Sequence, residues 1–281
     1  MSPQYRSSQR SPACIRGHLP APRVADDTRH APSPDIAILV YHRFSATAAA
    51  DPMAVSLATL EAQLQHLRDS GYQFVPLRDI VAWRHDAAAP LPPKAVALTV
   101  DEGHRSIYDL LRPIASREQL PVTLFVYPSA VSHAVDTLTW DQLDRLHEAG
   151  RFDVQSHTWW HPDFNVANRQ HAADTFRSAA LDLFAAARLR IERQLGNTVD
   201  LLAWPFGSHD DALVSLAGEA GYTAGFTLDA RKVRRDAHAL TLPRYLMVEA
   251  CTPAVLGRLL NAPGHACGGC ADRRQRAAGS E

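Results

Sequence analysis

Short apolar runs alternate with amphipathic helical segments along most of this chain, and polar motifs stand where several apolar runs end. Strand–helix–strand units in succession are typical of a parallel sheet, which can close into a barrel. The active sites of such barrels lie at the carboxyl ends of the strands. The pattern therefore predicts an α/β fold, a (β/α) barrel, with its chemistry at one edge of the sheet.

The expected strands are apolar and cover residues 36–41, 74–77, 95–100, 122–127, 152–155, 201–204, 224–227 and 240–246. The expected helices cover residues 57–70, 77–84, 105–118, 139–150, 169–195, 211–220 and 252–260. Ser56 is suited to cap the first helix, Pro113 is expected to bend the third, and residues 46–52 are expected to be a loop.

Three segments are expected along the 281 residues. Residues 1–35 are rich in Pro, Ser and Arg and are predicted to be disordered. Residues 36–260 are predicted to form a single domain, because no repeat and no second domain is indicated. Residues 261–281 are predicted to be a flexible tail. Within it, His265, Cys267 and Cys270 could form a metal or redox clip, but a Gly-rich tail is the favoured interpretation, since two cysteines supply only half of a structural zinc site.

The charge balance gives no reason to expect nucleic acid or a membrane surface as a partner. The chain has 29 basic and 30 acidic residues, a formal net charge of −1. No run of about 18 apolar residues predicts a transmembrane helix. Residues 1–35 also lack the apolar core of a signal peptide, which leaves a cytoplasmic location open.

Two adjacent carboxylates and two histidines are the groups with the most specific chemistry. Asp101 and Glu102 end an apolar strand, and His157 and His161 follow another. One carboxylate and two imidazoles are a common set of ligands for a divalent metal, with positions left for water and substrate. The other carboxylate remains free as a base, which predicts metal-assisted hydrolysis. We expect zinc, with cobalt, nickel or iron as alternatives.

The motifs resemble those of the polysaccharide deacetylases, the NodB-homology or carbohydrate esterase 4 family. The resemblance rests on residues 101–103 (Asp-Glu-Gly), 156–162 (Ser-His-Thr-Trp-Trp-His-Pro), 204–207 (Trp-Pro-Phe-Gly) and 242–245 (Leu-Pro-Arg-Tyr). Residues 38–43 (Ile-Leu-Val-Tyr-His-Arg) look most like the branch that deacetylates poly-β-1,6-N-acetylglucosamine. The resemblance covers about residues 36–250 and implies a distorted (β/α) barrel of about seven strands.

The resemblance also implies roles for single residues. Asp101 corresponds to the general base, and Glu102, His157 and His161 correspond to the metal ligands. Glu102 departs from the family, which has Asp at that position, so the metal would shift or the loop would adjust. Pro162 places His161 on a turn and not in a helix.

Further roles follow from the other motifs. The backbone N–H of Phe206 is expected to stabilise the oxyanion, and His42 is the candidate proton donor. Arg244 is expected to pair with Asp101, because Ala203 stands where the family usually has an arginine. Trp160 and Trp204 are expected to line a sugar-binding cleft, with core packing as the alternative.

The function predicted from these residues is a metal-dependent hydrolase that removes N-acetyl groups from a carbohydrate polymer containing N-acetylglucosamine. Two alternatives stay open: a deacetylase of another amide, or a carbohydrate-binding relative with chemistry weakened by Glu102. The family resemblance implies work in the periplasm or outside the cell.

Overall fold

The computed structural model describes residues 34–47, 51–86, 88–164 and 173–262. The described residues from 34 onward belong to one compact unit. The expected disorder of residues 1–35 falls almost entirely outside the described residues, as does the tail with His265, Cys267 and Cys270. Both expectations remain predictions.

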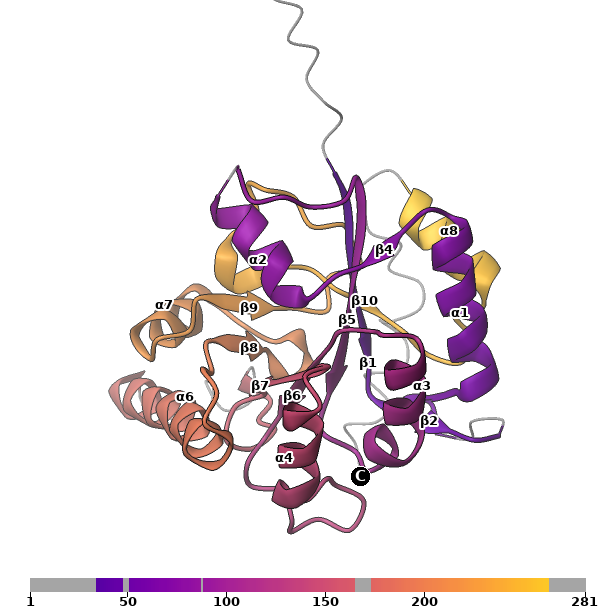
Figure 1. The fold of residues 1–281 in the computed structure, drawn as a ribbon. Coiled ribbons are helices and arrows are strands. Elements are labelled where there is room, and N and C mark those ends of the chain that lie inside the picture. Colours follow the sequence, from indigo (N-terminus) through magenta and orange to yellow (C-terminus); the bar gives the residue numbers. More distant parts are fainter. Residues whose placement is uncertain (1–33, 48–50, 87, 165–172, 263–281) are drawn as a thin grey trace, which may run out of the picture. The chain divides into compact units, whose positions relative to one another are not determined.

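A curled parallel sheet forms the centre of the unit, with helices around it (Figure 1). The strand order is β10-β1-β5-β6-β7-β8-β9, and β4 pairs with β5 beside this path. The strands are β1 (Asp35–Tyr41), β4 (Gln73–Phe74), β5 (Lys94–Asp101), β6 (Val122–Val126), β7 (Phe152–Ser156), β8 (Leu201–Ala203), β9 (Ala224–Phe226) and β10 (Tyr245–Leu246). The predicted seven-stranded, barrel-like α/β fold is confirmed as a curled half-barrel.

The segment before β10 joins the two ends of the sheet. Leu242 forms an isolated bridge with Phe226, while Tyr245 and Leu246 pair with β1. The prediction of one strand over 240–246 was therefore wrong in part: Ala239–Thr241 is a 3₁₀ turn. Pro243 follows the bridge, and a proline has no N–H to continue a ladder.

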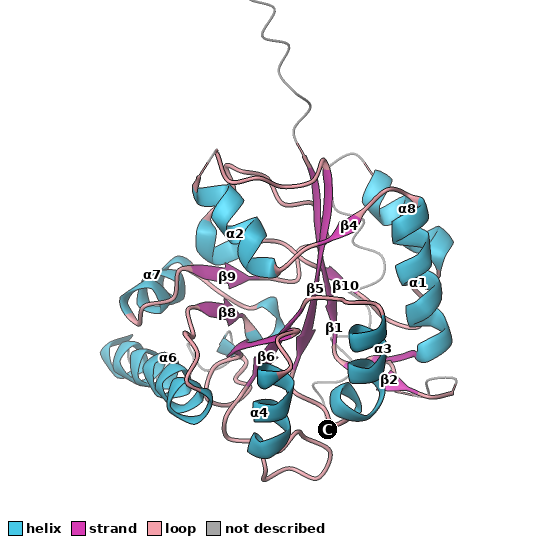
Figure 2. Ribbon diagram, viewed as in Figure 1, coloured by secondary structure: helices cyan, strands magenta, loops and turns pink. Residues whose placement is uncertain are grey.

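Helices surround the strands in Figure 2. They are α1 (Leu57–Asp69), α2 (Leu77–His85), α3 (Arg112–Arg117), α4 (Trp140–Glu148), α6 (Ala173–Leu195), α7 (Asp211–Glu219) and α8 (Pro253–Asn261). Ser56 caps α1 as predicted, since its side chain accepts a hydrogen bond from the Thr59 N–H. Before Pro113 the helix widens into a π-turn at Ile107–Leu111.

Alternate residues of β1 enter two different cores. Ile36 and Ile38 pack with α2, whereas Leu39 and Tyr41 pack with α1 and its neighbours. A strand buried on both faces is apolar at nearly every position, and this explains the continuous apolar run in the sequence.

Two short strands that flank the expected loop were missed. β2 (Arg43–Ser45) and β3 (Ala54–Ser56) form a separate parallel pair, with Arg43 opposite Ala54. Strands of three residues are too short for a periodic signal. The pair matters because β2 directs Arg43 toward the motifs at the carboxyl edge.

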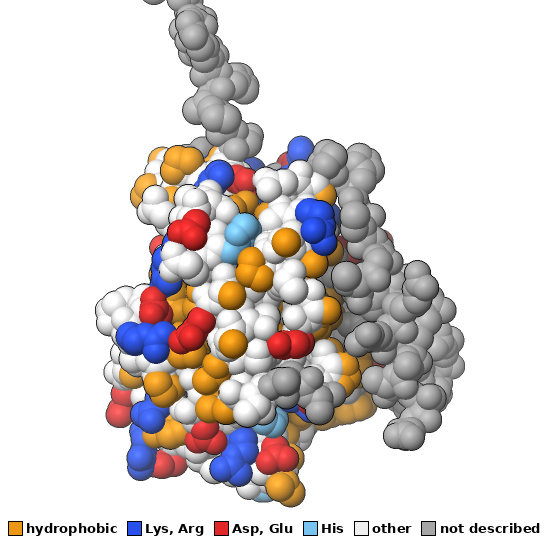
Figure 3. Space-filling model, turned by 90° about the vertical axis from the view of Figure 1, so that its right-hand side faces the viewer, with side chains coloured by type: hydrophobic (Ala, Val, Ile, Leu, Met, Phe, Trp, Pro, Cys, Tyr) orange, Lys and Arg blue, Asp and Glu red, His pale blue; other side chains and the backbone are white. Residues whose placement is uncertain are grey.

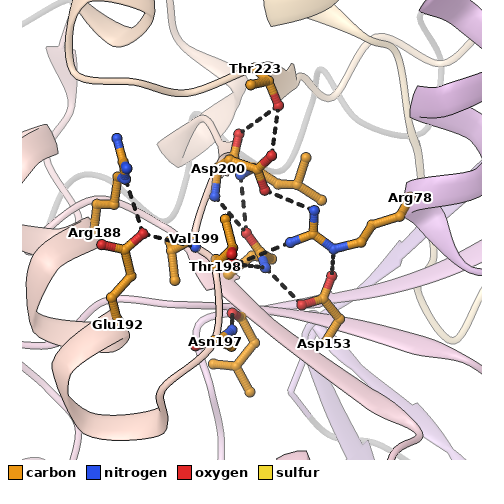
Figure 4. A network of polar contacts seen from close by, with 12 residues as sticks. Arg78, Asp153, Arg188, Glu192, Asn197, Thr198, Val199, Asp200 and Thr223 are labelled. Carbon is orange, nitrogen blue, oxygen red and sulfur yellow. Dashed lines mark hydrogen bonds and ion pairs between the residues drawn. The ribbon is translucent and has the colours of Figure 1, made fainter.

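An ionic network occupies the opposite, amino-terminal edge of the sheet (Figure 4). Arg78 of α2 forms ion pairs of 2.8 Å with Asp153 at the start of β7 and with Asp200 before β8. Gln155 donates to Asp153 and to the Thr198 carbonyl. These contacts tie a helix to two strands, the stabilising role expected of this edge.

The surface carries charges of both signs. On the face shown in Figure 3, acidic and basic side chains are interspersed with small apolar areas among the described residues. Among the described helices, none is long and apolar enough to cross a membrane.

Candidate active site

The motifs meet at the carboxyl edge of the sheet. Asp101 is the last residue of β5, His157 directly follows β7, and Phe206 lies in the turn after β8. Arg244 precedes β10, and His42 lies between β1 and β2. Because all these strands are parallel, their carboxyl ends share one edge.

Asp101 and Arg244 form a buried two-pronged ion pair. Arg244 Nη1 and Nη2 donate to the two carboxylate oxygens at 2.8 and 2.7 Å, and Asp101 is 2% exposed. Arg244 also donates to the Thr99 hydroxyl and the Thr227 carbonyl. Burial alone would raise the pKa of Asp101, but the Arg244 guanidinium, together with His157 and His42, outweighs burial and holds this pKa below its usual value. The carboxylate is thus ionised and fixed in direction.

Glu102 has a different setting one residue later. Its backbone is left-handed, with φ of 72°, and Gly103 follows with φ of 73°. A side chain at Gly103 would approach Val126 to 3.1 Å, so the glycine lets this turn pack against β6. The Glu102 carboxylate accepts a hydrogen bond of 3.1 Å from Arg43. Burial alone would raise the pKa of Glu102, but the charges of His42 and Arg43 reverse this and lower it.

His157 and His161 lie side by side, with ring centroids 4.9 Å apart. The Nδ1 of His157 lies 2.8 Å from the Ala203 carbonyl, which fixes the proton there and leaves Nε2 as a free lone pair. Burial lowers the pKa of His157 to about 4 and also lowers the pKa of His161. Both imidazoles are therefore neutral near pH 7, the form that binds a metal. His161 lies outside any helix, as Pro162 predicted.

His42 belongs to the same cluster. It is 5% exposed, and its Nδ1 is buried without a hydrogen-bond partner among the described residues. Burial lowers the pKa of His42, although the nearby Asp101 and Glu102 carboxylates act in the opposite direction. A buried polar atom without a partner requires an explanation, and a ligand or substrate group is one.

The turn at Pro205–Gly207 also has a left-handed backbone. Phe206 has φ of 55° and its ring is half exposed, edge-on to the His161 ring at 4.3 Å. Gly207 is required here, because a side chain would come within 3.0 Å of the Leu228 backbone nitrogen. The turn is closed by the N–H groups of Gly207 and Ser208. The predicted oxyanion role of the Phe206 N–H remains a prediction.

The two tryptophans differ. Trp204 is fully buried, and its indole donates to the Leu240 carbonyl at 2.7 Å. It packs against Phe164 and Phe184, so the prediction that it lines a sugar cleft was wrong. Trp160 is 49% exposed and, with Trp159, lines an apolar groove of about 440 Å³ against α6.

The donor set suits a divalent metal, but its carboxylate is engaged. Two neutral imidazoles and a carboxylate are typical zinc ligands. Glu102 interacts electrostatically with both His157 and His161, and yet its hydrogen bond goes to Arg43. Among the residues that the structure describes, no three side chains form a ready-made metal cluster. The predicted convergence of Glu102, His157 and His161 remains a prediction.

Two residues of the cluster had no predicted role. Arg43 was part of the opening motif, but nothing in the sequence connects it to Glu102. Tyr127 directly follows β6, and its ring lies 6.4 Å from that of His157 and 5.9 Å from that of His161. Tyr127 is a polar residue at the end of the expected strand 122–127, and this position could have identified it as a site residue.

Comparison with known proteins gives consistent results. The polysaccharide deacetylase family model matches residues 88–225. A poly-beta-1,6-N-acetyl-D-glucosamine N-deacetylase of Staphylococcus epidermidis is 24% identical over 191 residues, which are 66% of this chain and 65% of that enzyme. This chain thus spans just under two thirds of that relative.

Solved structures share the fold. The Streptococcus pyogenes deacetylase PplD, in complex with acetate, has a TM-score of 0.70 at 21% identity, covering 81% of this chain and 98% of that one. IcaB of Ammonifex degensii has a TM-score of 0.68 at 21% identity, covering 81% and 97%. The family model thus places residues 88–225 in the polysaccharide deacetylase family, and the solved structures share the fold of this chain.

Proposed function

We propose that this protein is a metal-dependent hydrolase that removes N-acetyl groups from a polymer containing N-acetylglucosamine. One observation carries the proposal: a buried, ionised Asp101 lies at the same edge as Glu102 and two neutral imidazoles. The name of the staphylococcal relative makes a β-1,6-linked polymer the first substrate to test.

Glu102, His157 and His161 would hold the divalent cation. When bound, the cation supplies Lewis acidity toward the acetamide carbonyl and toward water. The two imidazoles offer lone pairs without first losing a proton near pH 7, since their pKa values are lowered by burial.

Asp101 is proposed as the general base. Arg244 holds both of its oxygens, so the carboxylate cannot rotate away from the proton that it accepts. A base that is pre-positioned in this way lowers the cost of reaching the transition state. Because the pKa of Asp101 is lowered, the base is ionised throughout the neutral range.

Phe206 and Trp160 are proposed to contact substrate. The Phe206 N–H would stabilise the developing oxyanion, since the left-handed turn holds this part of the backbone beside His161. The exposed face of Trp160 suits the apolar C–H edges of a sugar ring.

His42 is proposed as the donor of a proton to the leaving amine. His42→Ala should lower kcat by at least about tenfold with little change in KM, because an acid acts in the transition state and not in binding. The alkaline limb of the pH–rate profile, which burial of His42 shifts to below about pH 6.5, should also flatten. A pH–rate profile identical to that of the wild type would remove His42 from proton transfer.

The enzyme proposal is tested by acetate release from N-acetylglucosamine oligomers with β-1,6 or β-1,4 linkages. The protein is assayed as purified, after chelation, and after zinc or cobalt is restored. We expect release that stops on chelation and returns with the metal. Oligomers that bind without any release would instead support the carbohydrate-binding alternative, which the Arg43–Glu102 contact favours.

A further inference from the structure

Arg43 lies between two carboxylates at the rim of the site. Its Nη1 contacts the Asp51 carboxylate at 2.6 Å, and its Nη2 donates to Glu102 at 3.1 Å. The backbone of Arg43 is held by the β2–β3 pair, and Asp51 is fixed by a hydrogen bond of 2.8 Å from the Met53 N–H. Arg43 is thus held in place by contacts other than its hydrogen bond to Glu102.

We propose that Arg43 is a positioning residue that competes with the divalent cation for the Glu102 carboxylate and so weakens metal binding. The inference rests on the proposed function. Arg43 directly follows the candidate proton donor, His42, and is not among the proposed metal ligands.

The argument begins with the oxygen that both partners need. Arg43 donates to Oε2 of Glu102, so a cation that takes this oxygen must displace the guanidinium or share it. A guanidinium beside a divalent cation is also repelled by it, and repulsion is strong where water is partly excluded. Both effects lower the affinity of the site for a cation.

The substitution of Glu for the family's Asp belongs to the same argument. A glutamate has one more methylene than an aspartate, and the carboxylate of Glu102 lies 3.1 Å from Arg43. Its backbone is left-handed, and β5 ends at Asp101, one residue before it. The longer ligand and the arginine therefore act as a unit.

Exposure makes the contact reversible. The Arg43 side chain is 37% exposed and that of Glu102 22%, in contrast to the buried Arg244–Asp101 pair. A partly exposed pair is weaker than a buried one, so a divalent cation can displace the guanidinium. Asp51 remains as a partner for Arg43 once Glu102 has moved to the metal.

The test is the affinity for zinc and cobalt of the full chain, measured by competition with a chromophoric chelator. We expect Arg43→Met to bind either ion at least about tenfold more tightly than the wild type, since a charged hydrogen bond and a like charge are both removed. Arg43→Lys keeps the charge but loses the planar guanidinium. Its metal affinity should lie between those of the wild type and Arg43→Met. Its measurement keeps the proposal testable if the methionine variant folds poorly.

Two controls separate this effect from a general change of charge. In a Glu102→Gln background, Arg43→Met should give a smaller gain, because the contested carboxylate is gone and only the repulsion between the guanidinium and the cation is relieved. Arg105→Met removes a nearby exposed arginine that pairs with Asp109, and should leave the affinity unchanged.

Unchanged or weaker binding in Arg43→Met, or an equal gain with Glu102→Gln, would overturn the inference while the metal site stands. Wild-type affinity in His157→Ala would instead refute the proposed metal site. Failure of the wild type and of Arg43→Met to bind either ion would overturn both.

Discussion

Two consecutive residues, Asp101 and Glu102, each pair with an arginine, and the two pairs differ in nearly every physical respect. Asp101 and Arg244 are 2% and 0% exposed by side chain and make two hydrogen bonds. Glu102 accepts one hydrogen bond from Arg43, and both side chains of this pair reach solvent. The chain changes from an extended strand to a left-handed turn between the two carboxylates.

The comparison teaches how one sheet edge can supply two kinds of carboxylate. A base must keep one direction and one charge, and the buried two-pronged pair provides both. A metal ligand must exchange partners, which a weak and exposed pair allows. The predictions below test whether the two carboxylates have these separate roles.

The largest expected effect is on turnover. Asp101→Asn should lower kcat about 10²–10⁴-fold, because it removes the proton acceptor with little change in size. Asp153→Asn is a matched control, since Asp153 also pairs with an arginine but lies at the opposite edge of the sheet. It should keep near wild-type turnover. Equal losses in both variants would indicate a structural effect and remove Asp101 from the chemistry.

The second-largest expected effect is on stability, where replacing the two arginines should have different consequences. Arg244→Met should lower the free energy of unfolding by about 3–5 kcal/mol, because it leaves a buried carboxylate uncompensated. Arg43→Met should lower it by less than about 1 kcal/mol, as for an exposed pair. Denaturant unfolding of both variants measures the difference. Similar losses would show that the two pairs are equivalent.

The third prediction concerns pH. Both carboxylates have lowered pKa values, so their stabilising contribution is present above about pH 4 and is lost only as the pH falls below it. His157, with a pKa of about 4 in the fold against 6.5 when unfolded, binds a proton more readily in the unfolded state. Stability of the metal-free protein should therefore fall as the pH drops from 6.5 toward 4, by on the order of 3 kcal/mol from this residue.

His157→Asn should remove part of that slope, with His42 and His161 accounting for the rest, since their pKa values are also lowered. Unfolding curves from pH 7 to 4 measure it. If the slope of stability against pH is unchanged in His157→Asn, other groups cause the loss of stability between pH 7 and 4.

The smallest expected effect is that of Glu102→Asp. The shorter carboxylate should lose Arg43 and regain the ligand length of the family, which we expect to raise zinc affinity by about three- to tenfold. Competition titration measures the change. Weaker binding would mean that the site is built around glutamate.

Much of this arrangement could be predicted from the sequence. Buried parallel strands are apolar along their length, so β1, β5 and β6 were recognised, and parallel topology brings Asp101 and His157 to one edge. The Arg43–Glu102 contact could not be predicted, because it joins residues 59 positions apart through strands of only three residues. The burial of Trp204 depends on Phe184 and on the carbonyl of Leu240, neither of which its own motif indicates.

The most direct test of the separate roles of the two carboxylates measures bound cation and acetate release together in Asp101→Asn and Glu102→Gln. Each variant is loaded with zinc, desalted, and assayed for metal content and for turnover of N-acetylglucosamine oligomers. We predict that Asp101→Asn keeps one zinc per chain but releases acetate at least about 10²-fold more slowly than the wild type, and that Glu102→Gln loses the zinc. Loss of zinc in Asp101→Asn, or zinc content and turnover both retained in Glu102→Gln, would contradict the separate roles of these two carboxylates.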